Sequence, residues 1–438
     1  MASYYVWSGA TGSANGTSWA NAYTTLTAAF TGHAAGDTYY VAHDHAETPA
    51  AGTNIALASL GTVTAPTKIV CVNRAGSVPP VSADRRATAT VTTTTFGGIT
   101  FTGFSHYDGI IFNCGTAVNA VTIVLANAAG VSLRFDNCSL RLVNTAAGAK
   151  IQMLASGTYV ELNNTTMSFG NTNQCVQISA VMKWRNTPSA LLGTIPTQLF
   201  QVLSTDGGEV ECIGVDFSAA GSGKTLCNAV GTSNAVKFNF VDCKLDAAVT
   251  KSAVPLAHGA SEVDFIRSGS AGVNYTIFRH RLTGTLDHET TIVRTGGASD
   301  GTTAIAWKVI TTANCNYSLS FECPPIAIWN DTVGSAVTAT VEGIWGGGAV
   351  PNDDDIWIDV EYLGDASSPQ GSFVNDGKAD LLTAAAGQAS SSATWGGSTT
   401  AFKLAVTFTA QQKGWVYARV KCAKASSTFY IDPMVTLS

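Results

Sequence analysis

Two glutamates, Glu161 and Glu211, are the residues whose type and spacing could carry acid–base chemistry on a glycan. Each occupies the middle of a short alternating segment, "YVELN" and "EVECI". Glycosidases use two carboxyl groups about 5 to 9.5 Å apart, and two strands lying two steps apart in one sheet reach the upper end of that range. Lys183 is expected between them and would neutralise both. The sequence therefore favours a structural charge ladder, with catalysis by Glu161 and Glu211 as the alternative.

Other polar groups could bind ions, and each has a plainer interpretation. His43 and His45 would point the same way on a strand and could bind a metal with Glu47, but a two-histidine pair is a weak signal. The three aspartates at 353–355 lack the alternating oxygen ligands and the glycine of a calcium loop, so a solvated turn is expected. The Arg-His-Arg run at 279–281 could bind an anion, although we favour a solvated edge where the last coil ends. We predict no metal site and no cofactor.

A repeated strand–corner–strand pattern must position these side chains. Residues 130–144 read "GVSLRFDNCSLRLVN", in which the period-2 alternation of a strand breaks at Asn137 and then resumes. Asn tolerates the left-handed backbone conformation, so a sharp corner is expected there. Residues that follow such a corner recur at positions 114, 138, 165, 187, 215, 243 and 268. Intervals of 22 to 28 residues between short strands predict stacked coils, which form a single-stranded parallel β-helix.

Stacking of the coils predicts two ladders of side chains. The outward residues of the first strand in each coil would form a row at about 4.8 Å per step, and these residues are Arg134, Glu161, Lys183, Glu211, Asn239 and Asp264. The alternating signs suggest mutual neutralisation. Cys114, Cys138 and Cys243 would form an inward ladder.

Composition agrees with an all-β chain and excludes several classes of protein. Of 438 residues, 45% are hydrophobic and only 12% are charged, and the 43 glycines suit tight corners. The net charge of −6 gives no support for nucleic-acid binding. No apolar run is long enough to cross a bilayer. The ten cysteines include no Cys-x-x-Cys, so buried free thiols are expected.

The N-terminal segment carries a resemblance to a known fold family. Trp19, Tyr23, Leu26 and Phe30 are at helical spacing, and Gly36 begins the sequence "GDTYYV". This segment resembles the N-terminal cap of pectate-lyase-like right-handed parallel β-helix proteins. The resemblance implies a short helix over the open end of the β-helix, and it implies nothing about catalysis.

The C-terminal third of the chain has a different pattern of apolar and polar residues. Segments such as "DDIWIDVEYLG" and "GWVYARVKCA" alternate strictly, which predicts an antiparallel β-sandwich. The run at 384–400 reads as a flexible loop. The fold class is thus all-β, with a cap and first coil at 1–50, a parallel β-helix at 51–290 and a sandwich at 291–438. This last part resembles the C-terminal domains of phage-encoded virion proteins.

Function is inferred from that resemblance and from missing features. The first residues lack a secretory signal, and the cap begins within the first ten residues, so no anchoring domain is expected before it. The leading interpretation is a non-enzymatic bacteriophage virion protein, assembled in the host cytoplasm, that decorates or cements the capsid and binds the major capsid protein. The alternative is a tailspike or fibre that binds a host polysaccharide, with cleavage of that polysaccharide as a further activity to test. The resemblance implies a homotrimer, and neither membrane nor nucleic acid is an expected partner.

Overall fold

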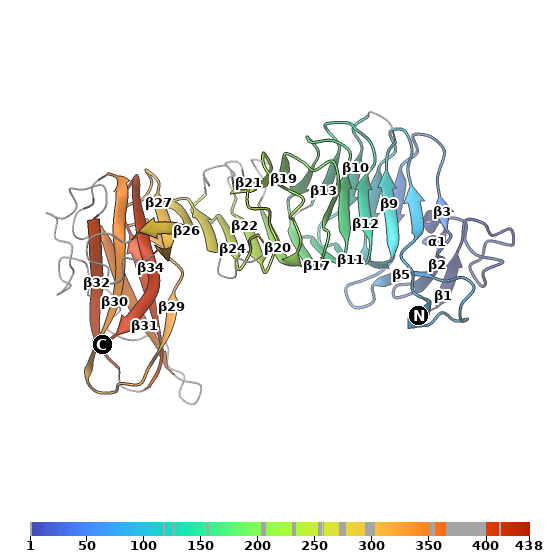
Figure 1. Cartoon of the computed structure of the whole chain (residues 1–438). Coiled ribbons are helices and arrows are strands. Elements are labelled where there is room, and N and C mark those ends of the chain that lie inside the picture. Colours follow the sequence, from blue (N-terminus) through green and yellow to red (C-terminus); the bar gives the residue numbers. More distant parts are fainter. Residues whose placement is uncertain are drawn as a thin grey trace. The chain divides into compact units, whose positions relative to one another are not determined.

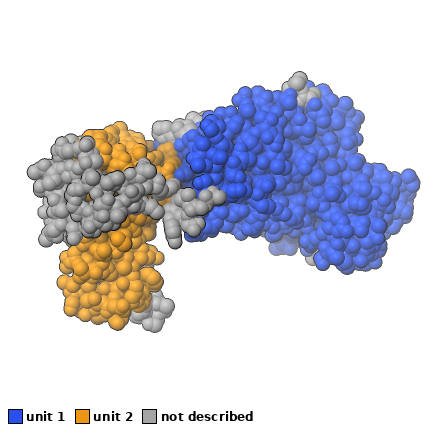
Figure 2. All heavy atoms as spheres, viewed as in Figure 1, with its two compact units in different colours: residues 1–276 blue, residues 277–438 orange. Residues whose placement is uncertain are grey.

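The computed structural model is an all-β chain with a β-helix and a C-terminal antiparallel part (Figure 1). It describes residues 2–116, 119–125, 128–155, 157–202, 207–229, 234–252, 256, 258–270, 277–293, 303–349, 351, 355–364, 400–410 and 413–438. The chain divides into two compact units, residues 1–276 and 277–438 (Figure 2). The predicted domain boundaries at 50 and 290 stay predictions. Within the described residues, no helix has the length and apolar character to cross a bilayer.

The first unit is a parallel β-helix built from three sheets, as predicted. Sheet A contains β1 (Ser3–Val6), β2 (Thr38–Ala42), β5 (Thr67–Val72), β8 (Phe104–Asp108), β11 (Ser132–Asp136), β14 (Tyr159–Asn163), β17 (Val181–Thr187), β20 (Gly208–Val215), β22 (Val236–Val241) and β24 (Glu262–Ile266). Sheet B contains β3 (Ala46–Glu47), β6 (Ala89–Thr92), β9 (Ile110–Cys114), β12 (Ser139–Leu142), β15 (Thr166–Phe169) and β18 (Leu191–Gly193). Sheet C contains β4 (Ile55–Ala58), β7 (Ile99–Thr102), β10 (Thr122–Leu125), β13 (Lys150–Met153), β16 (Cys175–Ile178), β19 (Gln198–Val202), β21 (Thr225–Ala229) and β23 (Thr250–Ser252).

A single left-handed residue turns the chain from sheet A toward sheet B in successive coils. Asn137, Asn164 and Asn186 have φ angles of 54°, 48° and 49°. Asp242 and Arg267 take the same conformation further along, at 53° and 47°. Asn and Asp adopt this conformation more readily than most side chains because their short polar groups can bond locally. The corner predicted at Asn137 is therefore confirmed, and so is its recurrence.

One predicted corner, at Asn113 and Cys114, is wrong. The coil of β8 and β9 turns at Gly109, with φ 78°, while Cys114 lies at the end of β9. Cys114 pairs in register with Leu142, four residues beyond Cys138. The predicted ladder of three cysteines therefore fails, because Cys114 occupies another rung. The sequence marks this corner weakly, because its left-handed residue is a glycine followed by an ordinary strand.

Large aromatic side chains fill the interior of the β-helix. Trp184 is fully buried, and its ring meets Phe217 edge-on with centroids 5.4 Å apart. Phe240 and Phe265 of adjacent coils stack with centroids 4.2 Å apart. All ten cysteines are free and buried, as expected, and burial raises the pKa of the Cys114 thiol to about 11. Such thiols pack as small apolar groups.

The N-terminal cap is smaller than the sequence suggested. The helix α1 (Leu26–Ala29) is a single turn, with Thr25 as its N-cap. Tyr23 instead forms an isolated bridge to Val6, so the helical spacing that began at Trp19 does not correspond to a helix. Short β-type pairing of this segment with β1 covers that end of the coil. A 3-10 turn, η1 (Ser82–Asp84), lies in a later loop.

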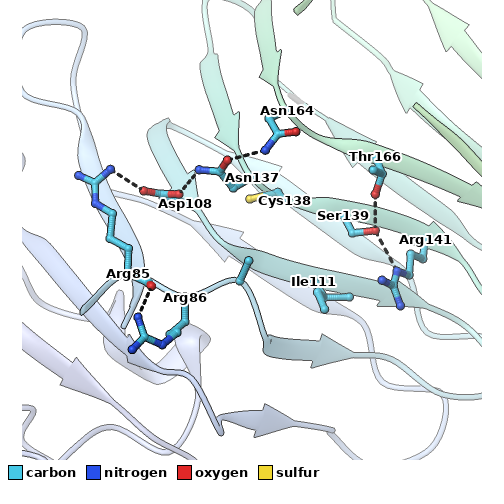
Figure 3. Close-up of a pocket in the computed structure, with 11 residues that line it drawn as sticks. Arg85, Arg86, Asp108, Ile111, Asn137, Cys138, Ser139, Arg141, Asn164 and Thr166 are labelled. Carbon is cyan, nitrogen blue, oxygen red and sulfur yellow. Dashed lines mark hydrogen bonds and ion pairs between the residues drawn. The ribbon is translucent and has the colours of Figure 1, made fainter. Parts of the chain in front are cut away.

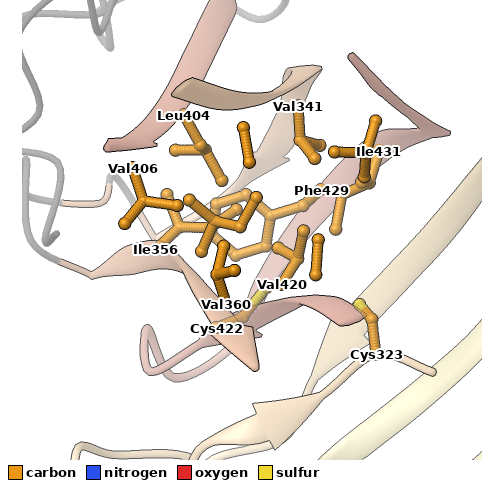
Figure 4. Close-up of a cluster of buried hydrophobic side chains, with 14 of the residues drawn as sticks. Cys323, Val341, Ile356, Val360, Leu404, Val406, Val420, Cys422, Phe429 and Ile431 are labelled. Atoms are coloured by element: carbon orange, nitrogen blue, oxygen red, sulfur yellow. The ribbon is translucent and has the colours of Figure 1, made fainter. Parts of the chain in front are cut away.

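The second unit consists of antiparallel strands around one core, as predicted for the C-terminal part. One group contains β25 (Ile277–Arg281), β26 (Gly284–Val293), β27 (Thr303–Thr311), β34 (Ser427–Leu437), β30 (Ala336–Gly348) and β32 (Thr400–Thr409). The other contains β28 (Phe321–Glu322), β33 (Gly414–Cys422), β29 (Ile326–Asn330) and β31 (Ile356–Gly364). Val341 and Phe429 from the first group meet Ile356 and Val420 from the second (Figure 4). The predicted loop at 384–400 lies outside the described residues up to 399.

Candidate functional site

The outward side chains of sheet A form one continuous row in register. The row contains Lys68, His106, Arg134, Glu161, Lys183, Glu211, Asn239 and Asp264. It includes the six residues placed there from the sequence, in the predicted order. At about 4.8 Å per step, seven steps extend over about 34 Å. A row of this length offers charged and amide groups at regular spacing to an extended ligand.

Glu161 and Glu211 lie in this row on either side of Lys183. The Nζ atom of Lys183 is 2.9 Å from a carboxylate oxygen of Glu211, and Arg185 is 3.7 Å from the other oxygen. The hydrogen bond to Glu211 is the main reason that the pKa of Lys183 is raised. Glu161 is flanked by Arg134 and Lys183 in register, yet forms no ion pair within 4.0 Å in the described part of the chain. The two carboxylates therefore have different electrostatic surroundings.

A second acidic group lies two residues along the same strands. Asp136 accepts a hydrogen bond from His106 Nε2 at 2.7 Å and bonds from Arg134 Nε at 3.0 Å. Burial disfavours the ionised carboxylate, but these bonds outweigh it and the pKa of Asp136 is lowered. Asp136 is therefore ionised at neutral pH and offsets one positive charge at this end of the row.

An open pocket lies at the corner between sheets A and B, and no residue of the row lines it. We call it the corner pocket; its volume is about 570 Å3, within the usual size range of ligand sites. Figure 3 shows Arg86 and Arg141 on opposite sides, with Ile111 between them. The lining residues are Arg85, Arg86, Ala87, Asp108, Ile111, Asn137, Cys138, Ser139, Arg141, Asn164 and Thr166.

A chain of hydrogen bonds holds one wall of the corner pocket (Figure 3). Asn164 Nδ2 donates to Asn137 Oδ1 at 2.8 Å, and Asn137 Nδ2 donates to Asp108 Oδ1 at 2.8 Å. Arg85 completes the chain with an ion pair to Asp108 at 3.1 Å. The Asp108 side chain is only 5% exposed, and a buried polar group is tolerated when it is hydrogen-bonded or paired. The wall is thereby fixed before any ligand arrives.

Part of this pocket is predictable from the sequence, but its cations are not. Asn137 is a predicted corner residue, and Asn164 precedes position 165, which the repeat also places after a corner. Arg85 and Arg86 were not singled out because the loop that carries them has no strand period. Their adjacency was an available signal, since Lys and Arg together number only 24 in the chain.

The two histidines of the weak alternative metal site are separated in the structure. His43 lies in a turn outside β2 and β3, so the two rings do not share a strand face. His45 is buried, accepts a bond from the Ser8 N–H at 3.0 Å, and lies 3.5 Å from Glu47. Glu47 accepts the N–H of Leu26 at 2.8 Å. His45 and Glu47 thus fasten the cap to the first coil.

The remaining candidate residues, at 353–355 and 279–281, include side chains that are buried in the second unit. Asp355 is buried and pairs with Lys424 at 3.2 Å, whereas residues 353 and 354 lie outside the described residues. His280 is buried in β25 and pairs with Thr285 of β26, so the solvated edge expected at 279–281 is wrong for this residue. Its neighbour Arg281 and its burial both favour the neutral ring.

Because His280 is buried, we predict that the second unit loses folding stability as the pH falls. Burial, with a smaller effect from Arg281, lowers the pKa of His280 to about 4 from an ordinary 6.5. Between these values the unfolded chain binds the proton and the folded chain does not, so stability falls as pH drops from 6.5 toward 4. The loss is about 3 kcal/mol in total. Denaturant unfolding at pH 7 and pH 4.5 should show a smaller loss for His280→Gln than for wild type, and equal losses would contradict the assignment.

Comparisons with known proteins add two distant likenesses. No protein-family model matches the chain, and no curated protein sequence matches it. The tailspike protein 4 enzymatically active domain of bacteriophage CBA120 is similar over 92% of this chain, with 9% identity and a TM-score of 0.23. The chain covers 64% of that domain's length. An alginate lyase from Paenibacillus sp. str. FPU-7 is similar over 52% of this chain and 96% of its own, with 12% identity and a TM-score of 0.25. The pairing of its own strands shows that this chain is a parallel β-helix protein with a C-terminal antiparallel part.

Proposed function

We propose that the chain binds a bacterial surface polysaccharide along the outward row of sheet A, as a tailspike or fibre component of a bacteriophage particle. The row itself carries the binding proposal. Its acids, bases and amide recur on successive strands, and a linear glycan presents hydroxyl groups at regular intervals. Tyr159 lies beside the row, with Lys183 Nζ 5.9 Å from its ring centre. It supplies an aromatic surface next to the charged groups.

The virion part of the proposal rests on the resemblance of the C-terminal segments to phage virion proteins. The tailspike likeness is too distant to add to it. Capsid decoration, the leading interpretation from the sequence, gains nothing from the fold or from the comparisons, and host-surface binding replaces it. Trimer formation and contact with the major capsid protein stay predictions.

Cleavage of the bound glycan is a second candidate function. Glu161 is favoured as an acid–base group because it has no ion-pair partner within 4.0 Å in the described structure, although two cations flank it. Glu211 is less suited, because Lys183 and Arg185 hold it. Two strand steps separate Glu161 from Glu211, which puts the distance between their carboxyl groups near the upper limit for an inverting glycosidase.

A panel of purified bacterial surface polysaccharides tests both functions on the full chain. We expect saturable binding of at least one polymer, weakened about tenfold or more by Tyr159→Ala, because loss of one buried contact surface is worth about 1.4 kcal/mol or more. Lys413→Gln, an exposed change in the second unit, is the matched control. Release of new chain ends by wild type and its loss in Glu161→Gln would establish cleavage. Absence of binding to every polymer would refute the proposed function.

A further inference from the structure

The corner pocket is a positively charged spot on an acidic protein. Three arginines and one aspartate line it, which leaves a formal charge of +2, whereas the whole chain carries −6. The ion pair of Arg85 with Asp108 accounts for one arginine. The surplus charge therefore resides on Arg86 and Arg141.

Neither surplus arginine has a carboxylate within ion-pair distance in the described residues. Arg86 donates through Nη1 to the carbonyl oxygens of Ala83 and Arg85, at 3.1 and 2.7 Å. Arg141 donates through Nε to Ser139 Oγ at 2.9 Å. A guanidinium has five N–H donors in a fixed planar array. Both side chains thus retain N–H groups that can bind an oxyanion in a bidentate manner.

The nearby acids are already occupied. Asp84, the carboxylate closest to Arg86 along the chain, accepts the backbone N–H groups of Ser77 and Val81, at 3.1 and 2.9 Å. Asp136 is held by His106 and Arg134. An external anion is therefore the partner that the two arginines lack.

We infer that the corner pocket binds an oxyanion substituent of a polysaccharide, a carboxylate, sulfate or phosphate group, between Arg86 and Arg141. The inference rests on the proposed function and narrows its ligand to an acidic polymer. The sugar that bears the anion lies against Ile111, and the polar edge formed by Asn164 and Thr166 meets its hydroxyl groups. Ile111, Arg141 and Thr166 belong to sheet B, so the pocket is a contact separate from the row on sheet A.

Three polymers with one backbone test the inference: dextran, carboxymethyl dextran and dextran sulfate. The full chain should bind at least one anionic polymer tenfold or more tightly than dextran, and the preference should fall as salt is raised. Replacing both arginines, in Arg86→Gln/Arg141→Gln, should weaken that binding about tenfold or more, as expected for lost charge-assisted bonds. Arg267→Gln is the matched control, because Arg267 is an exposed corner arginine already paired with Asp242 at 2.7 Å. Thermal unfolding of each variant checks the fold.

The outcomes separate the inference from the proposed function. Equal binding of the three polymers, or an unchanged preference in the double variant, would overturn the anionic site even if a polysaccharide of the bacterial panel binds the row. A different result is that inorganic phosphate stabilises the wild-type chain but not the double variant, while none of the three polymers binds. That result would assign the pocket to a small free anion and overturn the inference of a polymer ligand. A preference for anionic dextran that the two arginines carry would support an anionic site at the corner pocket even if every polymer of the bacterial panel failed, a failure that would refute the proposed function.

Discussion

Trp184→Ala is expected to lower the free energy of unfolding of the β-helix by about 3 to 5 kcal/mol, because it removes the largest side chain that is fully buried among the described residues. The indole contacts Phe200 and Phe217 edge-on, so its loss leaves a cavity among rigid rings. Its Nε1 atom also donates to Thr165 O at 2.9 Å and to Thr187 Oγ1 at 3.0 Å. Equilibrium denaturation followed by circular dichroism measures the change.

A second substitution separates the volume of Trp184 from its hydrogen bonds. Trp184→Phe retains most of the ring but leaves the buried Thr165 carbonyl without this donor, so a loss of about 1 to 3 kcal/mol is expected. Met434→Ala, at an exposed position in the second unit, is the control for a large-to-small change at the surface. A loss below 1 kcal/mol for Trp184→Ala would show that the interior collapses around the missing ring.

The repeat could be predicted because its corners depend on local conformation. Asn137 and Asn164 are residue types that accept a positive φ, and the alternation on either side reports which face is buried. Once two coils are aligned, the register of every outward residue follows. The charge row, including Glu161 and Glu211, was predictable for that reason.

The corner pocket could not be predicted in the same way. Its arginines come from a loop and from β12, which the sequence separates by more than fifty residues and which no local period relates. A glycine corner is a weaker signal than an asparagine corner, because glycine serves many purposes in a β-rich chain. The wrong corner at Asn113 and the missed one at Gly109 have this common cause.

Gly109→Ala is expected to destabilise the β-helix by about 2 to 5 kcal/mol, the sum of a left-handed backbone penalty and overpacking. With φ at 78°, a Cβ atom at Gly109 would lie 2.0 Å from the carbonyl oxygen of Arg86 and 3.1 Å from Cys71 Cβ. The main chain cannot move aside as the end of a flexible side chain can, so the loop that carries Arg86 must shift.

Gly130→Ala provides the matched control for this change. Its φ is 75°, but nothing lies within 4 Å of the added Cβ, so only the backbone penalty of about 1 to 2 kcal/mol is expected. The difference between the two variants in urea unfolding isolates the contact with the Arg86 loop. Because that loop carries one cation of the corner pocket, Gly109→Ala should also weaken binding of the anionic dextrans, while Gly130→Ala should not. Equal stability losses in the two variants would mean that the loop moves freely, and the corner pocket would then lack the fixed wall that anion binding requires.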